Sequence, residues 1–245
     1  MTGVELVFVI LIFITAFLYA SVGHGGASGY LTLMVLFGIE TSIMRSTALT
    51  MNLFVSGIAF VSFYRAGHFN FKLFWPFAIT SIPAAYIGAQ LSIDPRLYKI
   101  ILGVFLIIAM ARLLIPFSMK DKVIKPLPTI PAFGIGGLLG IFSGMIGIGG
   151  GIILSPVLIL FRWADMRQTA GISALFIFVN SVSGLAGLSI NSQIHYPNQL
   201  LLWILAVVFG GLAGGYSGSH KFSINGLRII LSLVMLFATY KLFMG

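Results

Sequence analysis

The chain has 245 residues, of which 59% are hydrophobic and 8% are charged, and its formal net charge is +9. A soluble domain carries about 25% charged residues, so this composition excludes a water-soluble globular protein and predicts an integral membrane protein. The absence of cysteine excludes disulfides, thiolate catalysis and iron–sulfur clusters, and the excess of Lys and Arg is typical of cytoplasmic loops rather than of a nucleic-acid-binding surface.

The amino terminus begins with an apolar stretch that has no basic residue ahead of it, which favours a retained first helix over a cleaved signal peptide. Further apolar runs of the length that crosses a bilayer, roughly 17 to 25 residues, follow along the whole chain. We therefore expect an all-α polytopic membrane protein with about eight full transmembrane helices and additional short helices. The runs are Ser46–Tyr64, Phe71–Leu91, Leu97–Pro116, Thr169–Ser189 and Gly226–Phe243.

Two glycine clusters interrupt this pattern, at Gly23–Gly26 and at Gly147–Gly151. The apolar stretches behind them, 29–39 and 151–161, are too short to span, because about 11 residues at roughly 1.5 Å per residue cover half of the hydrocarbon thickness. Unpaired backbone amides in lipid cost several kcal/mol each. The pattern therefore predicts two broken or re-entrant helices whose glycine breaks line a cavity or are packed within the protein.

The chain also repeats itself, since five segments of its first part recur in the same order in its second part. We divide it into a first transmembrane repeat (1–116), a cytoplasmic linker (117–128) and a second transmembrane repeat (129–245). An odd number of membrane elements before the linker inverts the second repeat, as in many secondary transporters. The alternative is a duplicated scaffold or channel without a transport cycle. The matches are Ser21–Ala27 with Met145–Gly151, Arg45–Ala48 with Arg167–Ala170, Ser56–Gly57 with Ser183–Gly184, Trp75 with Trp203, and Leu97–Leu102 with Gly226–Leu231.

Helices that begin at the breaks would point free N–H groups and the positive end of the helix dipole toward the membrane centre, which favours a bound anion. The alternative is that these glycines only permit tight helix packing. The candidate substrate-binding residues are Gly23, His24, Gly25, Gly26, Ser28, Asn52, Gly147, Gly149, Gly150, Gly151, Ser155 and Asn180.

Three ionisable side chains are candidates for further roles. His24 can neutralise a bound anion or couple transport to protons, or it can be a neutral histidine satisfied by a backbone carbonyl. Arg45 and Arg167 can attract an anion to the outer and inner mouths, or they can be snorkelling anchors at helix ends. Trp75 and Trp203 are expected at the membrane interface.

The motifs resemble those of the TauE/SafE sulfite exporter family of membrane transporters over essentially the whole chain. The resemblance implies export of a small sulfur-containing or organic anion, such as sulfite or a sulfonate, across a bacterial or archaeal plasma membrane. The residues that carry it are Ser21–Gly26, Gly144–Gly151, Ser155-Pro156 and the two Arg-x-Thr-Ala segments at Arg45 and Arg167.

No catalytic constellation, cofactor motif or metal-ligand cluster is present in the sequence, so we expect no enzyme activity, no cofactor and no metal. The expected partners are a small anionic substrate and the lipid bilayer, and not nucleic acid. A passive anion channel and a non-transport membrane subunit or enzyme are the alternatives.

Overall fold

The computed structural model describes residues 3–91, 94–114, 124–190 and 194–219, together with Leu236 and Tyr240. Within these residues the chain forms α-helices and no strands, which confirms the all-α expectation for this part of the protein. The helices are α1 (Gly3–Ala20), α2 (Ala27–Leu36), α3 (Thr41–Arg65), α4 (Phe71–Gln90), α5 (Pro95–Leu114), α6 (Thr129–Ile146), α7 (Gly151–Leu160), α8 (Met166–Ile190) and α9 (Leu200–Ser219).

Five of these helices, α1, α3, α6, α8 and α9, are long and apolar enough to cross a membrane. The helices α4 and α5 have 20 residues each. The count of about eight full spans stays a prediction, because the expected span Gly226–Phe243 and residues 117–123 of the expected linker lie outside the described residues.

The two short helices are present, with 10 residues each. Helix α7 begins at Gly151 as expected, whereas α2 begins at Ala27, two residues before the start expected from the apolar pattern. Each helix therefore starts directly after its glycine cluster. Gly26 and Gly150, the residues just before α2 and α7, both adopt a positive φ, a backbone conformation that glycine tolerates without strain.

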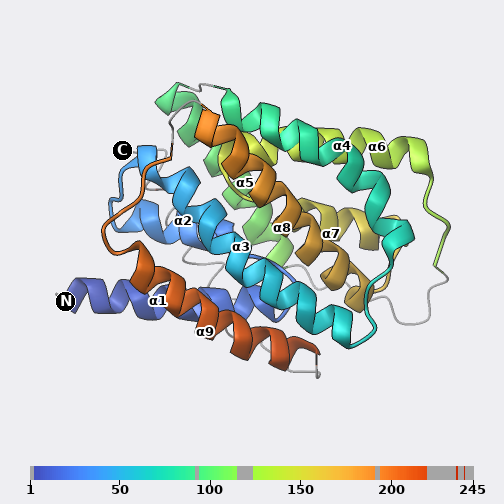
Figure 1. The fold of residues 1–245 in the computed structure, drawn as a ribbon, viewed down its shortest axis with the longest axis horizontal. Helices are drawn as coiled ribbons and strands as arrows, with labels where there is room; N and C mark the ends of the chain where they lie inside the picture. Colours follow the sequence, from blue (N-terminus) through green and yellow to red (C-terminus); the bar gives the residue numbers. More distant parts are fainter. Residues whose placement is uncertain are drawn as a thin grey trace.

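The helices form a layered bundle in which α3 and α8 lie between the pair α1 and α9 and the pair α4 and α6 (Figure 1). Helices α1 and α9 run in the same direction, away from the labelled N-terminus, and α4 and α6 run in the opposite direction. Both outer pairs are thus parallel, and the two pairs are antiparallel to each other.

Glycines spaced four residues apart allow each outer pair to pack closely. A side chain at any of them would collide with a backbone carbonyl of the neighbouring helix, so the two backbones are in direct contact, as in small-xxx-small packing of membrane helices. In α6 these glycines are Gly136, Gly140 and Gly144, which meet Phe77, Ser81 and Ala85 of α4. In α9 they are Gly210, Gly214 and Gly218, which meet Phe13 and Phe17 of α1 and Ser21 directly after it.

The central helices α3 and α8 are antiparallel. Gly57 in the second half of α3 faces Phe178, and Leu49 in the first half of α3 faces Gly184, which comes later in α8 than Phe178. The lengths of the helices repeat as well, since α1 to α4 have 18, 10, 25 and 20 residues and α6 to α9 have the same lengths in the same order.

One expectation about the membrane interface is wrong. Trp203 is only 5% exposed and packs in the core against Phe8, with ring centroids 4.7 Å apart. Trp75, in contrast, is 37% exposed on α4, as an interfacial anchor would be. Trp203 is buried because α9 packs along α1, a contact that the local sequence does not reveal.

Candidate functional site

The candidate site contains two helix starts, those of α2 and α7, which follow the glycine breaks. Gly26 (φ 95°) caps α2 and Gly150 (φ 76°) caps α7, and neither cap supplies a side-chain hydrogen bond. The first N–H groups of a helix have no partner within it. Both breaks therefore place backbone donors that have no partner within their own helix inside the bundle.

The two breaks meet at the same two side chains. A Cβ atom on Gly25 would contact the Asn52 amide and lie 2.9 Å from Ile177 Cγ2, and a Cβ on Gly149 would lie 2.7 Å from the same Ile177 atom and 3.0 Å from Asn52 Nδ2. Asn52 comes from α3 and Ile177 from α8, where each occupies the same position counted from the first residue of its helix. The structure thus brings the two glycine clusters together at the centre of the bundle.

Asn52 connects the two breaks through its amide. Its Oδ1 accepts a hydrogen bond from the Ala27 N–H, the first of α2, at 3.0 Å, and its Nδ2 donates to the Ile148 carbonyl oxygen at 3.2 Å. Asn52 is fully buried. One side chain therefore occupies a donor of the first break and an acceptor of the second.

His24 forms a second connection, between the first break and helix α7. Its Nε2 lies 3.0 Å from Ser155 Oγ on α7, and Ser155 Oγ lies 2.8 Å from Ser173 Oγ on α8. On the other side of the ring, Nδ1 lies 2.9 Å from the Val22 carbonyl oxygen, which can only accept. Nδ1 therefore carries a proton, and in the neutral ring Nε2 accepts from the Ser155 hydroxyl.

This chain of hydrogen bonds can reverse its polarity. Protonation of His24 would make Nε2 a donor to Ser155, and Ser155 would then donate to the Gly151 carbonyl oxygen, which lies 3.0 Å away. The protonation state of His24 would thereby determine which hydrogen bond Ser155 donates in the first turn of α7.

The remaining glycines of the two breaks are closely packed. Gly23 lies against the Ala170 backbone, Gly26 under the Tyr30 ring, and Gly147 against the Arg45 backbone, where a Cβ would lie 3.2 Å away. A Cβ on Gly150 would lie 2.9 Å from the Phe176 ring, and one on Gly151 would lie 2.5 Å from Ile177. These contacts support the packing role that the sequence left open for the glycines.

The two predicted polar residues Ser28 and Asn180 lie in different surroundings. Ser28 is buried, and its hydroxyl pairs with the Tyr19 hydroxyl at 2.7 Å. Asn180 donates from Nδ2 to the Phe176 carbonyl oxygen of its own helix, and its buried Oδ1 has no partner among the described residues. Ser28 thus joins α2 to α1, whereas no hydrogen bond joins Asn180 to either break.

Arg45 lies partly buried at two helix ends. Its Nη2 donates to the Ala89 carbonyl oxygen at the end of α4 and to the Gly144 carbonyl oxygen near the end of α6, both at 2.9 Å. A cation is favourable there because the C-terminal ends of helices carry partial negative charge. In this position Arg45 joins three helices.

Arg167 is exposed at the start of α8, and the two arginines therefore differ in their surroundings. Its Nη1 lies 3.3 Å from His68 Nε2 in the connection between α3 and α4. Its backbone N–H donates to Asp165 Oδ1 at 2.8 Å. Arg167 is thus accessible to a soluble ion, whereas Arg45 is largely enclosed.

The sequence did not identify Ile177, Tyr19 or Tyr30 as site residues. An isoleucine in an apolar helix gives no signal, so the sequence does not single out Ile177. The alignment of the two Arg-x-Thr-Ala segments also does not match Ile177 with Asn52. Tyr30 is fully buried with its hydroxyl over Gly26, and that hydroxyl has no partner among the described residues. The signal available in the sequence for this residue was a tyrosine hydroxyl four residues after Gly26.

The described residues contain no group of three or more acidic or histidine side chains that would hold a metal ion. The polar groups at the breaks are amides, hydroxyls, one imidazole and backbone N–H groups. Such groups can donate hydrogen bonds to an oxyanion.

Comparison with known proteins agrees with the helical architecture and the paired glycine motifs. The family described as sulfite exporter TauE/SafE matches residues 8–242. The chain belongs to this family. A probable membrane transporter protein of Sinorhizobium fredii, y4hK, is 34% identical over 234 residues, which cover 94% of each chain.

More distant relatives of this TauE/SafE family member carry the same type of name. The probable membrane transporter protein MJ0441 of Methanocaldococcus jannaschii is 29% identical over 91% of this chain and 89% of its own length. YjnA of Bacillus subtilis is 27% identical over 90% and 92%. No solved structure matches the chain. The family and the relatives indicate a membrane transporter rather than an enzyme.

Proposed function

We propose that this protein is a secondary transporter that exports a small sulfur-containing or organic anion, such as sulfite or a sulfonate, across a bacterial or archaeal plasma membrane. The observation that carries the proposal is the meeting of two helix starts, α2 and α7, at Asn52 and Ile177. Two positive helix ends at one buried place favour an anion without a fixed side-chain charge.

The proposal includes an inverted repeat of residues 1–116 and 129–245 joined by a cytoplasmic linker at 117–128. The repeated helix lengths, the antiparallel central helices α3 and α8, and the two outer pairs with opposite directions support it (Figure 1). Inverted repeats allow alternating access by movement of one half against the other around a central site.

In the conformation seen here, the breaks close on Asn52 and Ile177. The proposed cycle therefore requires the halves to separate, so that the anion takes the place of the Asn52 amide at the Ala27 N–H. The glycines serve both purposes in this scheme, since they allow the closed packing and they expose backbone donors when the halves part.

Flux through proteoliposomes tests the function. We expect uphill movement of sulfite, sulfoacetate or a related anion when an ion gradient is imposed. Movement only down the anion's own gradient would indicate a passive channel, and no flux of sulfite, sulfate, thiosulfate, sulfonates or carboxylates would leave a non-transport membrane subunit or enzyme as the better assignment.

The substitution Asn52→Asp tests the position of the site. It keeps the shape of the side chain but places a carboxylate between the two helix starts, and we expect it to abolish anion flux because it occupies the site with fixed negative charge. Asn70→Asp at the start of α4 is the control for the added charge, because Asn70 lies outside the predicted site and its side chain accepts a hydrogen bond from the Lys72 N–H. Equal flux through both variants, with both folded, would place the anion path elsewhere.

A further inference from the structure

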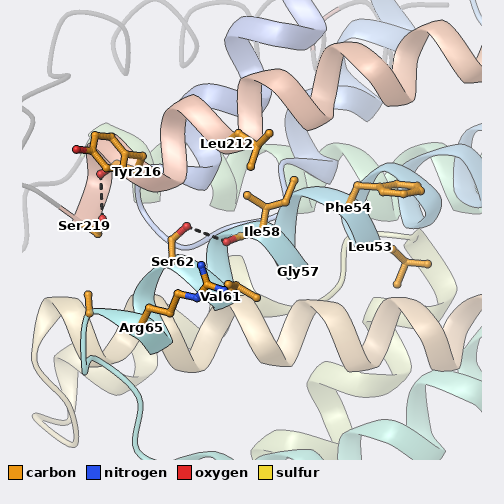
Figure 2. Close-up of a pocket in the computed structure, with 11 residues that line it drawn as sticks. Leu53, Phe54, Gly57, Ile58, Val61, Ser62, Arg65, Leu212, Tyr216 and Ser219 are labelled. Atoms are coloured by element: carbon orange, nitrogen blue, oxygen red, sulfur yellow. Dashed lines mark hydrogen bonds between the residues drawn. The ribbon is translucent and has the colours of Figure 1, made fainter.

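An open groove lies between α3 and α9, away from the glycine breaks (Figure 2). It has a volume of about 670 Å³. The residues that line it form one stripe along each helix. They are Leu53, Phe54, Gly57, Ile58, Val61, Ser62 and Arg65 on α3, Ala66 directly after it, and Leu212, Tyr216 and Ser219 on α9.

The groove is apolar at one end and polar and basic at the other. Leu53, Phe54 and Ile58 form the apolar end, whereas Ser62, Arg65 and Ser219 lie toward the end where α3 stops. Figure 2 shows the Arg65 side chain reaching back along α3 toward Val61. Among the described residues no acidic side chain pairs with Arg65, which is exposed.

The length of the groove corresponds to one leaflet of a bilayer. From Leu53 to Arg65 the helix rises about 18 Å at roughly 1.5 Å per residue, and half of the hydrocarbon core is about 15 Å. The walls of the groove face outward, since Phe54 is 40% exposed, Val61 45%, Leu212 51% and Tyr216 70%. An acyl chain along the groove would therefore have its headgroup at the level of Arg65.

We propose that this groove binds one anionic phospholipid, with an acyl chain along Leu53 to Val61 and the phosphate at Arg65. The last turn of α3 carries Arg65, and basic residues at the ends of transmembrane helices are typical of the cytoplasmic face, so we place this end of α3 there. Basic pockets between transmembrane helices on that face are suited to anionic headgroups. A small hydrated anion fits the groove less well, because most of the lining is apolar.

The lipid site is independent of the proposed transport site. The α3 residues that line it are on a different face of the helix from Asn52, which is fully buried among the breaks. The lipid would fill the space between α3 and α9, which belong to different proposed repeats, and would thereby couple their packing to the lipid composition.

Titration of the purified full chain with phosphatidylglycerol or phosphatidylcholine, followed by native mass spectrometry, tests the proposal. We expect phosphatidylglycerol to bind more tightly, and we expect Arg65→Gln to weaken it about fivefold, the factor for one basic side chain at an anionic headgroup. Arg162→Gln is the matched control, because Arg162 is an exposed arginine outside the groove and should leave the affinity unchanged.

A second pair of variants tests the apolar part of the groove. Val61→Trp should fill it and abolish phosphatidylglycerol binding, whereas Val182→Trp, at a similarly exposed valine on α8, should retain it. The proposal would be overturned if the two arginine variants weakened binding equally, if Val61→Trp left binding unchanged, or if both lipids bound with equal affinity. It would also be overturned if free sulfate, in place of phosphatidylglycerol, bound in a way that depends on Arg65.

Discussion

The two glycine breaks have the same backbone plan but different side chains around them. At the first break, the leading N–H of α2 is bonded by Asn52, and His24 reaches across to Ser155. At the second break, Ile148 stands in the place of His24 and Ile177 in the place of Asn52. The residues up to α3 therefore supply the amide and the imidazole, and α7 and α8 supply hydroxyls and an apolar wall.

This difference shows that backbone symmetry and chemical symmetry are separate properties of the protein. Two similar glycine breaks are enough to bring two helix starts to one place, because close packing needs only small residues at the positions that meet. A single amide is then enough to connect them. Asn52 bonds to both breaks because it lies where they meet, so this connection does not require a second asparagine at position 177.

The largest effect is expected for Gly25→Val. A Cβ at Gly25 already collides with the Asn52 amide, and valine adds two further methyl groups in a closely packed place. Overpacking of this kind costs about 3 kcal/mol or more, so little folded protein should be recovered by size-exclusion chromatography.

The matched control for this variant is Gly134→Val on α6. Nothing lies within 4 Å of a Cβ at Gly134, so the melting temperature should stay close to that of the unmodified protein. Normal folding of Gly25→Val would show that the breaks are not held together in the manner described.

A smaller effect is expected for Asn52→Leu. The substitution removes the hydrogen bonds to Ala27 and Ile148 and leaves a buried donor and a buried acceptor without partners. Hydrogen bonds between membrane helices contribute about 0.6 to 1.7 kcal/mol each, so the free energy of unfolding should fall by about 1–3 kcal/mol. Asn180→Leu, measured in the same thermal unfolding experiment, should fall by less, because Asn180 bonds only within α8.

The two arginines give the next comparison. Arg45→Gln should lower the free energy of unfolding by about 1.5–3 kcal/mol, because a charged donor to two carbonyl groups is lost. Arg167→Gln should change stability by less than about 1 kcal/mol, as is usual for exposed charges.

If Arg167 attracts the substrate, Arg167→Gln should lower transport more than Arg45→Gln does, which is the reverse of their order in stability. Flux in Arg167→Gln should then fall most at low ionic strength, because salt screens an exposed charge. The same fractional loss at every salt concentration would assign Arg167 to packing at the start of α8.

A small effect is also expected for the contact between His24 and Ser155. A double-mutant cycle with His24→Leu and Ser155→Ala should give a coupling energy of about 0.5–1.5 kcal/mol, since one hydrogen bond joins them. A coupling energy near zero would mean that the two side chains are neighbours without a stabilising bond.

Particular residues show how far the sequence could predict this site. The half-length helices behind the glycine clusters were predictable, and so was the presence of Asn52, His24 and Ser155 near the breaks, because glycine at membrane depth and polar groups in apolar helices are rare and visible signals. The roles of Ile177 and Trp203 were not predictable. An apolar residue in an apolar chain carries no mark of which neighbour it will contact.

The sequence by itself determined that the protein is a helical membrane protein and where its helices break, since chain length in lipid and backbone hydrogen bonding leave few alternatives. It also determined the family, through the paired motifs. Only the tertiary structure decided that the two breaks share Asn52 and Ile177, that Arg45 is enclosed while Arg167 is exposed, and that a groove opens between α3 and α9. The physical reason is that these features depend on contacts between residues far apart in the chain, which local composition and periodicity do not encode.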